Sequence, residues 1–332
     1  MKKILSSLFL TSASLMMFSQ TIFNSDFNSY TTGNLGPDAN NTSPGQGGWY
    51  SNGGTVAAYQ VSSIDAAHGK SISLTSGIGY TATNSPHNRT ANQDFTTTAT
   101  PGNDYLIGTM DIYTGSGAGL SKAFLSMFGT AAAVGGIGYN SVDQKFFGIG
   151  WLSVGGAAPG YYHVGLGDAT ATAPANTWVS VGFSYNKTTG KYVWITPNGS
   201  YTVDANPTVT FVPNLVALDY NLQVQTQTGN AATRTFAFDN LNIFYSNLAL
   251  GTNEGVKANK VLVEIYPNPT TDVLNVRTDS MVKKVEIFDL AGKKINAELI
   301  DGKVDVNNLT AGAYMIKIET NDGLTMKKFI KK

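Results

Sequence analysis

Thr177-Trp-Val-Ser-Val-Gly-Phe-Ser-Tyr185, Asn186-Lys-Thr-Thr-Gly190 and Lys191-Tyr-Val-Trp-Ile195 are the consecutive segments that decide the fold of the central part of this chain. The first and third are short runs rich in β-branched and aromatic residues, and the second is a turn sequence that ends in glycine. Together they predict a β-hairpin. Every second residue from Val179 to Phe183 is apolar and the residues between are small or polar, so one face of the hairpin is expected to be buried.

Short apolar runs of the same kind recur through residues 20–245, where glycine, threonine, serine and asparagine separate them. Helical spacing of apolar residues is nearly absent, so this region is predicted to be all-β. Roughly ten or more strands over this length suit a two-sheet jelly-roll sandwich in a single domain. Besides the hairpin, the predicted strands are Ser71–Leu74, Tyr105–Tyr113, Phe124–Phe128, Lys145–Leu152, Tyr161–Gly165, Leu222–Thr226 and Phe236–Phe244.

Four short blocks near the ends of this region carry a family resemblance. They are Ile22-Phe-Asn-Ser-Asp-Phe-Asn-Ser-Tyr30, Gly47-Gly-Trp49, Ala67-His-Gly-Lys-Ser-Ile-Ser-Leu74 and Phe238-Asp-Asn-Leu-Asn-Ile243. In this order they resemble the concanavalin A-like lectin/glucanase group. The resemblance implies a jelly-roll fold, but a fold of this kind does not fix a function.

The same resemblance implies a structural calcium ion on the convex side of the sandwich. Mapped onto this chain, its ligands would lie around Asn24, Gly69 and Asp239. Calcium binds six to eight oxygens and accepts backbone carbonyls, so these residues are chemically suitable. The alternative is that Asp239 and Asn240 only cap a turn.

Residues 261–332 form a second β pattern, which opens with Val261-Leu-Val-Glu-Ile-Tyr-Pro-Asn-Pro-Thr-Thr-Asp-Val-Leu-Asn-Val276. Pro267 and Pro269 end its first strand, because proline fixes φ and lacks the donor of a ladder hydrogen bond. Further short strands separated by glycine and asparagine turns predict a small Ig-like β-sandwich after the jelly roll.

Three blocks of this tail occur in a telling order: Tyr266-Pro-Asn-Pro269, Val285-Glu-Ile-Phe-Asp-Leu-Ala-Gly-Lys293 and Asn308-Leu-Thr-Ala-Gly-Ala-Tyr-Met-Ile-Lys-Ile318. They resemble the type A sorting domain of the Bacteroidetes type IX secretion system. The resemblance implies export across the outer membrane with the type IX machinery as partner, and release or attachment at the cell surface. The residues expected to carry the signal are Tyr266, Pro267, Asn268, Pro269, Gly312, Tyr314, Lys327 and Lys328.

Residues 1–19 have the layout of a secretory signal peptide, with Lys2 and Lys3 before an apolar run and Ser19 before the expected cut. The run is too short and too rich in serine and threonine to span about 30 Å of hydrocarbon, so no transmembrane segment is expected after signal removal. Residues 246–260 lack a clear period and are predicted to be a linker between a jelly-roll domain (20–245) and a sorting domain (261–332).

Charge and cysteine usage exclude several classes of function. The chain has no cysteine, which excludes disulfides and cysteine zinc sites. Residues 20–252 hold seven lysines and arginines against eleven aspartates, a net charge of −4, and residues 253–332 hold thirteen against eleven, a net charge of +2. Neither part has the basic stripe that nucleic-acid binding needs, so no nucleic-acid partner is expected.

Catalysis is not favoured by the sequence, although it stays open. The first glutamate of the chain is Glu254, so the paired catalytic glutamates of the related glucanases cannot exist in residues 20–245. An aspartate pair could still serve a hydrolase, and Tyr161, Tyr162 and His163, or the loop 87–89, could serve a polysaccharide lyase. A Gly-x-Ser-x-Gly motif is absent.

Binding is the function that the sequence favours. Exposed aromatic rings stack on sugar rings while amide side chains read the hydroxyls. The candidate ligand-binding residues are Trp178, Tyr192, Trp194, Trp151, Tyr161 and Tyr162, and the nearby polar partners include Asn186, Gln223, Gln225 and Gln227. We therefore expect non-catalytic binding of a polysaccharide or cell-surface glycan, or adhesion. The alternatives are a glycan-active enzyme and a structural surface or biofilm protein without a discrete ligand.

Overall fold

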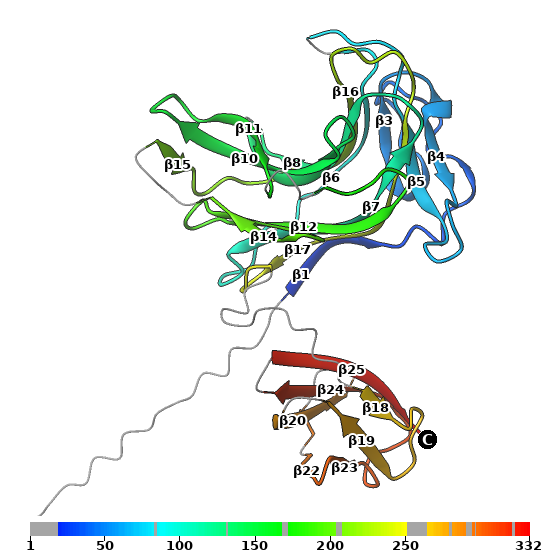
Figure 1. Ribbon diagram of the computed structural model, residues 1–332, viewed down its shortest axis with the longest axis vertical. Helices are drawn as coiled ribbons and strands as arrows, with labels where there is room; N and C mark the ends of the chain where they lie inside the picture. Colours follow the sequence, from blue (N-terminus) through cyan, green and yellow to red (C-terminus); the bar gives the residue numbers. More distant parts are fainter. Residues whose placement is uncertain are drawn as a thin grey trace, which may run out of the picture. The chain divides into compact units, whose positions relative to one another are not determined.

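The computed structural model describes residues 19–82, 85–130, 132–167, 172–203, 208–250, 264–278, 281–289, 294–295, 297–320 and 323–332. The chain forms two compact units, Met1–Thr252 and Asn253–Lys332 (Figure 1). Residues 1–18 of the predicted signal peptide and 251–260 of the predicted linker lie outside the described residues. Besides strands, the described residues contain two short 3-10 segments, η1 (Gln46–Gly48) and η2 (Val56–Ala58), and no α-helix.

Sheet A of the larger unit has the strand order β14-β13-β12-β7-β17-β5-β4-β2, and β1 pairs with β17. The first and last strands of the unit are therefore neighbours, with Asn24 opposite Asn242. The strands of this sheet are β1 (Ser19–Ser25), β2 (Gly33–Asn34), β4 (Tyr59–Ser62), β5 (Ser71–Thr75), β7 (Tyr105–Ser116), β12 (Trp178–Asn186), β13 (Tyr192–Thr196), β14 (Gly199–Thr202) and β17 (Thr235–Ser246).

Sheet B has the order β11-β10-β9-β8-β16-β6-β3, and β15 pairs with the end of β10. All of its pairings are antiparallel. Its strands are β3 (Tyr50–Asn52), β6 (Arg89–Asp94), β8 (Ser121–Phe128), β9 (Ala133–Asn140), β10 (Lys145–Val154), β11 (Gly160–Gly165), β15 (Val209–Phe211) and β16 (Asp219–Thr226).

The two sheets lie face to face (Figure 1), and their inner side chains form one core. Alternation along each strand decides which residues enter it. Met110 and Ile112 of β7 enter from sheet A, while Leu222 and Val224 of β16 enter from sheet B, all fully or almost fully buried. The predicted two-sheet all-β sandwich is confirmed.

The hairpin of β12 and β13 has the predicted buried face, since Val181 and Phe183 belong to the core. The prediction that Trp194 and Tyr192 present their rings to a ligand is wrong. Phe183 pairs with Trp194 across the hairpin, and residues directly opposite on an antiparallel pair share a face. Both rings therefore point into the core, where they stack on each other at 5.2 Å.

Glycines in sheet B make room for these two rings. A Cβ on Gly148 of β10 would lie 2.3 Å from the indole of Trp194, and one on Gly150 would lie 3.2 Å from the ring of Tyr192. The polar atoms of both rings are satisfied: Trp194 Nε1 donates to the carbonyl of Gly136 at 2.9 Å, and Tyr192 Oη donates to that of Val134 at 3.0 Å. Trp194 and Tyr192 thus bridge the two sheets without leaving a polar atom of either ring unpaired.

The C-terminal unit is also all-β and contains two four-stranded sheets, with orders β18-β19-β23-β22 and β21-β20-β24-β25. Leu274 and Val304 from the first sheet and Ile287, Ile316 and Phe329 from the second share one buried cluster, so the unit is a small sandwich. Its strands are β18 (Glu264–Tyr266), β19 (Val273–Arg277), β20 (Val282–Asp289), β21 (Lys294–Ile295), β22 (Leu299–Ile300), β23 (Lys303–Asp305), β24 (Gly312–Thr320) and β25 (Gly323–Lys331).

Candidate functional site

A groove of about 470 Å³ lies on the outer face of sheet B. We call it the aromatic groove, because Phe124 and Phe128 of β8, Trp151 of β10 and Tyr161 of β11 line it together with Gln223 and Gln225 of β16. Phe124, Phe128 and Trp151 belong to an apolar cluster separate from the core between the sheets. The sandwich thus carries a second set of packed aromatic rings on its outside.

The glycines of β9 explain why these rings can pack together. A Cβ on Gly138 would lie 2.3 Å from Cβ of Phe124 and 2.7 Å from the ring of Phe147. Because glycine leaves that space open, the two phenylalanines of β8 and β10 meet across β9, with ring centroids 5.8 Å apart. Gly136 makes the same kind of room for the end of Ile149.

Cross-strand pairing sets the rest of the groove floor. Trp151 is directly opposite Tyr161 on β10 and β11, which places both rings on the outer face. The ring of Phe128 stacks on that of Tyr161 at 6.1 Å, with an angle of 11° between the planes. The Trp151 side chain is partly exposed, and the Tyr161 residue is 38% exposed, so both offer surface to a ligand.

Two amides lie beside this floor on β16. Gln223 and Gln225 alternate with the buried Leu222 and Val224, so both point to the outer face. Gln223 Nε2 donates to Ser126 Oγ at 3.1 Å, which orients the amide. Within the described part of the chain, the Gln225 side chain has no hydrogen-bond partner, so its donor and acceptor remain available to a ligand.

A chain of polar contacts continues from the groove along the same face. Tyr161 Oη lies 2.8 Å from His163 Nε2, and His163 Nδ1 lies 3.0 Å from Lys122 Nζ. Burial, followed by the nearby Lys122 charge, lowers the pKa of His163 to about 4, so this imidazole is neutral at neutral pH. Burial also raises the pKa of Tyr161 and lowers that of Lys122.

The chemistry of these groups fixes the direction of the hydrogen bonds. A charged Lys122 can only donate, so Nδ1 of His163 accepts and Nε2 carries the imidazole proton. Nε2–H then donates to the Tyr161 oxygen. The phenolic O–H of Tyr161 is left to donate toward the groove.

A smaller pocket of about 270 Å³ adjoins this chain, and we call it the lysine pocket. It is lined by Lys122 of β8, Asn140 of β9 and Lys145 of β10, together with Asp143, Phe147 and His163. Lys122 and Phe124 are two residues apart on β8, as are His163 and Tyr161 on β11. The lysine pocket and the aromatic groove therefore follow each other along the same face of sheet B.

Two aspartates also meet on sheet B. Asp94 of β6 is directly opposite Asp219 of β16, and Asp219 is in turn opposite Phe128, which lines the groove. Burial raises the pKa of Asp219, the Asn221 amide lowers it, and the Asp94 charge raises it further. Asp94 and Asp219 are thus one facing pair of aspartates, and Asp239 and Asp111 on sheet A are another.

The predicted ligand-binding residues fall into three places. Trp151 and Tyr161 lie together in the aromatic groove with Gln223 and Gln225. Tyr192 and Trp194 are 1% and 0% exposed, so they cannot present their rings to a ligand, and this part of the prediction is corrected. Tyr162 points away from its neighbours on β11 and packs against the core between the sheets.

Trp178, the remaining candidate, lies on sheet A instead. Its ring stacks on the imidazole of His68 at 4.2 Å and contacts Tyr113, which is opposite it on β7. It is the first residue of β12 and precedes Val179 and Val181, which point into the sandwich. Trp178 therefore belongs to the outer face of sheet A and does not share a site with Trp151.

Phe124, Phe128 and Lys122 are groove and pocket residues that the sequence did not single out. Phe124–Phe128 was predicted as a strand, but its aromatic rings were not separated from core residues. The signal was present in the spacing: Lys122, Phe124, Ser126 and Phe128 alternate with the buried Ala123, Leu125 and Met127. A strand with apolar residues on both faces indicates that its outer face is also covered.

The residues expected around a calcium ion lie near the outer face of sheet A. Asp239 of β17 is 1% exposed, and burial raises its pKa to about 6, with Asp111 and Asp26 raising it further against His68 and the Asn240 N–H. Gly69 has a φ of +61°, and a Cβ there would lie 2.1 Å from Asn28 Oδ1.

Asn24 is paired with Asn242, three residues beyond Asp239 on β17. The carboxylates whose charges raise the pKa of Asp239 are Asp111 and Asp26. A buried carboxylate suits a cation chemically. In the described ranges, however, no three acidic or histidine side chains are grouped to hold one. Calcium stays a prediction.

The predicted sorting residues come together in the C-terminal unit. The Tyr266–Pro269 segment contains two cis X–Pro bonds and lies against β25, because Asn268 Oδ1 accepts the N–H of Ile330 at 2.9 Å. Tyr314 is buried and stacks on Phe329 of β25. Gly312 pairs with Lys331, Lys327 is exposed opposite Ile316, and Lys328 lies opposite Met315. The first and last sequence blocks of the tail thus pack around one strand.

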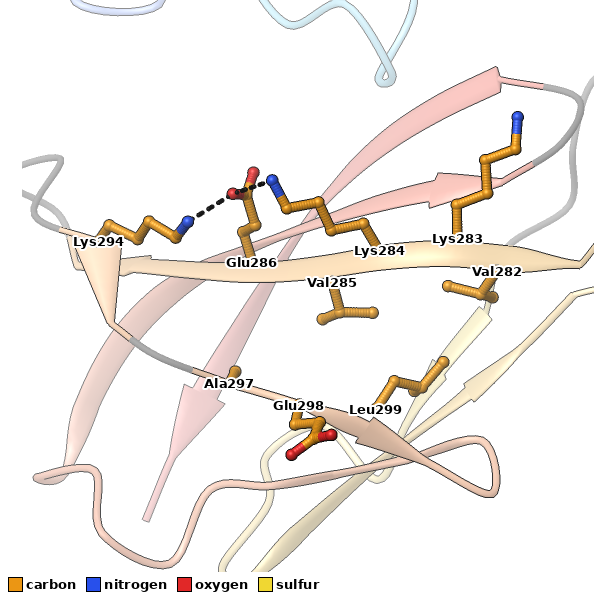
Figure 2. Close-up of a pocket in the computed structure, with 9 residues that line it drawn as sticks. All are labelled: Val282, Lys283, Lys284, Val285, Glu286, Lys294, Ala297, Glu298 and Leu299. Atoms are coloured by element: carbon orange, nitrogen blue, oxygen red, sulfur yellow. Dashed lines mark hydrogen bonds and ion pairs between the residues drawn. The ribbon is translucent and has the colours of Figure 1, made fainter. Parts of the chain in front are cut away.

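A hollow of about 750 Å³ opens between β20 and the segment that leads into β22 in this unit. Figure 2 shows Val282 and Val285 pointing toward Leu299, with the Glu286 carboxylate on the other side of β20 between Lys284 and Lys294. Glu286 lies 2.7 Å from Lys294 Nζ, 2.9 Å from Lys284 Nζ and 3.6 Å from Lys317 Nζ. Hydrogen bonds from Lys294 and Lys284 lower the pKa of Glu286 to about 2, so this group stays ionised and is not placed to move a proton.

The fold and the tail together define an exported β-protein with a jelly-roll sandwich and a C-terminal sorting domain. Residues 264–332 match the family of secretion system C-terminal sorting domains. The tail is thus a type IX sorting domain, as predicted, and it indicates secretion across the outer membrane to the cell surface or the extracellular space. Within the described residues, no helix has the length and apolar character needed to cross a membrane.

Among curated proteins, β-agarase D of Zobellia galactanivorans is 35% identical over 69 residues, which is 20% of this chain and 14% of the agarase. The chain therefore spans a small part of that relative, and the aligned length equals that of the sorting domain.

Solved structures with similar folds include an alginate lyase from a Chlorella virus, LamAcat from Zobellia galactanivorans and a Bacillus licheniformis β-glucanase. The alginate lyase is 11% identical with a TM-score of 0.41, covering 68% of this chain and 99% of its own. LamAcat is 12% identical with a TM-score of 0.39, covering 68% and 97%. The β-glucanase is 13% identical with a TM-score of 0.36, covering 67% and 97%. At these scores the likeness carries no information about activity.

Proposed function

We propose that this exported protein binds a polysaccharide in the aromatic groove of sheet B. The observation that carries the proposal is the combination of two partly exposed rings, Trp151 and Tyr161, with the amides of Gln223 and Gln225 in one groove. Sugar rings offer apolar C–H faces and hydroxyl edges, so a site of this composition recognises both.

The size and rigidity of the groove support this function. Its volume of about 470 Å³ falls within the roughly 300–1,000 Å³ of small-ligand sites, which suits a short run of sugar units. The rings are held by packing, since Phe128 stacks on Tyr161 and Phe124 packs against Phe147. A floor that is already ordered loses little conformational entropy on binding.

The test is a titration of oligosaccharides against the purified full chain, followed by calorimetry. Trp151→Ala and Tyr161→Ala should each weaken binding by about tenfold or more, because each removes a stacking ring. Trp178→Ala is the matched control, because it removes a partly exposed tryptophan from the other sheet. Equal losses for Trp151→Ala and Trp178→Ala, or no binding at all, would contradict the proposal.

A glycan-active enzyme is the second candidate, and the Tyr161–His163 pair favours a lyase. A protonated Tyr161, supported by His163 at 2.8 Å, can donate a proton to a leaving sugar oxygen. The loop alternative is less well placed, because Arg89 is 8% exposed and its guanidinium donates to the carbonyls of Pro86 and Asn88.

The Asp94–Asp219 pair favours a hydrolase instead. A glycosidase needs one carboxyl group that stays protonated and one that stays ionised, and the pKa of Asp219 is raised by burial. Product analysis separates the two chemistries: a lyase creates a carbon–carbon double bond that absorbs ultraviolet light, and a hydrolase creates only new reducing ends. Loss of the first with His163→Gln or of the second with Asp219→Asn would identify the enzyme, and the absence of both products leaves binding alone.

A further inference from the structure

Lys122 is placed unusually for a surface lysine. Its side chain is only partly exposed, its Nζ lies 5.3 Å from the centroid of the Phe147 ring, and its hydrogen-bond partner is the neutral imidazole of His163 at 3.0 Å. In the described part of the chain, no carboxylate lies within ion-pair distance of Lys122 Nζ. Burial is the main cause of the lowered pKa of Lys122, and the charge of Asp143 acts in the opposite direction without offsetting it.

The lysine pocket places a second cation in the same row. Lys122 of β8 is opposite Asn140 of β9, and Asn140 is opposite Lys145 of β10. The two lysines are therefore separated by two strand spacings, about 10 Å, on one face of the sheet. An anionic group between them would be within reach of both ammonium groups and of the Asn140 amide.

The balance of charge in the pocket is positive. Asp143 is its carboxylate, and Asp143 Oδ1 accepts the backbone N–H of Lys145 at 3.2 Å. Two lysines against one aspartate, with His163 neutral, leave a net charge of +1 among the lining residues. This contrasts with the net charge of −4 over residues 20–252, so the pocket is a local positive site on an acidic domain.

We propose that the lysine pocket binds the acidic group of an anionic polysaccharide whose neighbouring sugar stacks in the aromatic groove. This inference rests on the proposed glycan binding and names the class of ligand: a chain that carries a carboxylate or a sulfate close to an uncharged sugar face. Lys122 contacts the acidic group directly, and its distance from Tyr161 through His163 sets the spacing between charge and stacking ring. A charge-assisted hydrogen bond to a partly buried lysine gives both affinity and selectivity.

The experiment compares three probes of matched length on the full chain by calorimetry: neutral agaro-oligosaccharides, carboxylated alginate oligosaccharides and sulfated carrageenan oligosaccharides. The proposal expects at least one anionic probe to bind about tenfold or more tightly than the neutral one, and expects this preference to shrink as salt is added. Which anionic probe binds separates carboxylate from sulfate as the recognised group.

Lys122→Gln should abolish the preference for the anionic probe, because it removes the cation that contacts the acidic group. Lys122→Arg keeps the charge and should retain the preference, which also covers the case where the glutamine variant folds poorly. Lys191→Gln is the matched control, because Lys191 is an exposed lysine directly before β13 of sheet A, whereas the lysine pocket lies on sheet B.

The outcomes separate this inference from the proposed function. Equal binding of neutral and anionic probes would overturn the anionic ligand and leave glycan binding in place. A Lys122→Gln variant that loses neutral and anionic probes alike would show that the lysine only positions His163 and Tyr161, and would also overturn it. If none of the probes binds and no other glycan does, the proposed function fails and the inference fails with it.

Discussion

Replacing Trp194 by alanine tests the assignment of aromatic residues to core or groove. The Trp194 side chain is 0% exposed, stacks on Tyr192 at 5.2 Å and donates a 2.9 Å hydrogen bond to the Gly136 carbonyl. A buried tryptophan removes about 200 Å² from water, worth about 5 kcal/mol at 25 cal/mol per Å², and the cavity left behind adds to the loss. Relaxation offsets part of this, so we expect about 3–5 kcal/mol of lost stability.

Trp151→Ala is the paired variant, because Trp151 lies on the outer face of sheet B and is only partly buried. It should cost under about 2 kcal/mol of stability while removing most of the glycan binding. For comparison, the stability of about 3–5 kcal/mol lost in Trp194→Ala corresponds to a fall in melting temperature of roughly 6–20 °C, at about 2–4 °C per kcal/mol for a domain of this size.

The assay is guanidinium denaturation of the full chain followed by tryptophan fluorescence. All four tryptophans of the chain, Trp49, Trp151, Trp178 and Trp194, lie in the larger unit, so the signal reports that unit alone and each variant keeps three reporters. A Trp194→Ala variant no less stable than Trp151→Ala would refute the placement of these two rings.

Four further predictions concern other parts of the chain. Gly138→Val should cost about 1–3 kcal/mol by denaturation, because its Cβ would lie 2.3 Å from Cβ of Phe124, whereas the control Gly165→Val has open space around it; equal costs would contradict the packing argument. The pKa of His163 falls from its ordinary 6.5 to about 4 in the folded state, so acid should destabilise the wild type more than His163→Gln between these pH values; an imidazole that titrates near pH 6.5 by NMR would contradict this. The pKa of Asp239 rises from its ordinary 3.8 to about 6, so its stabilising contribution is lost as the pH rises from 3.8 through 6. Above pH 6 and in chelator, Asp239→Asn should therefore be more stable than the wild type. Calcium should raise the melting temperature of the wild type only. Deletion of residues 261–332 should leave the rest of the chain folded in the periplasm, and its arrival in the medium would contradict the sorting role.

Alternation along the sequence predicted the central strands well, because period-two patterning survives wherever one face of a strand is buried. The strand Trp178–Asn186 shows this: its Val181 and Phe183 are in the core as expected. For the partner strand β13, residue type alone gives the wrong face, because the face is set by its register with β12. Tyr192 and Trp194 were assigned to the ligand because they are aromatic, although pairing with Phe183 sets their face.

Strand β9 illustrates what local sequence cannot reveal. Ala133-Val-Gly-Gly-Ile-Gly-Tyr-Asn140 reads as a glycine-rich loop, and it was not predicted as a strand. Its glycines leave space for side chains that are distant in the sequence. Gly138 packs against Phe124 and Phe147, and Gly135 packs against Phe183. Tertiary packing overrides local propensity at this position.

Only some of the residues of the candidate site could be predicted from the sequence. The sequence predicts a binding role for Trp151, Tyr161, Gln223 and Gln225, because aromatic and amide side chains suit sugars whatever the fold. The contact of Lys122 with His163 joins residues 41 positions apart on strands that are not neighbours in sheet B. No spacing rule in a single sequence could bring those two together.

The most direct test of glycan binding is an array of neutral and acidic glycans probed with the full chain, its Trp151→Ala variant and its Trp178→Ala variant. The groove on sheet B predicts discrete signals on a small set of glycans, lost with Trp151→Ala and kept with Trp178→Ala. A blank array, or signals that disappear with Trp178→Ala and persist with Trp151→Ala, would contradict binding in the aromatic groove.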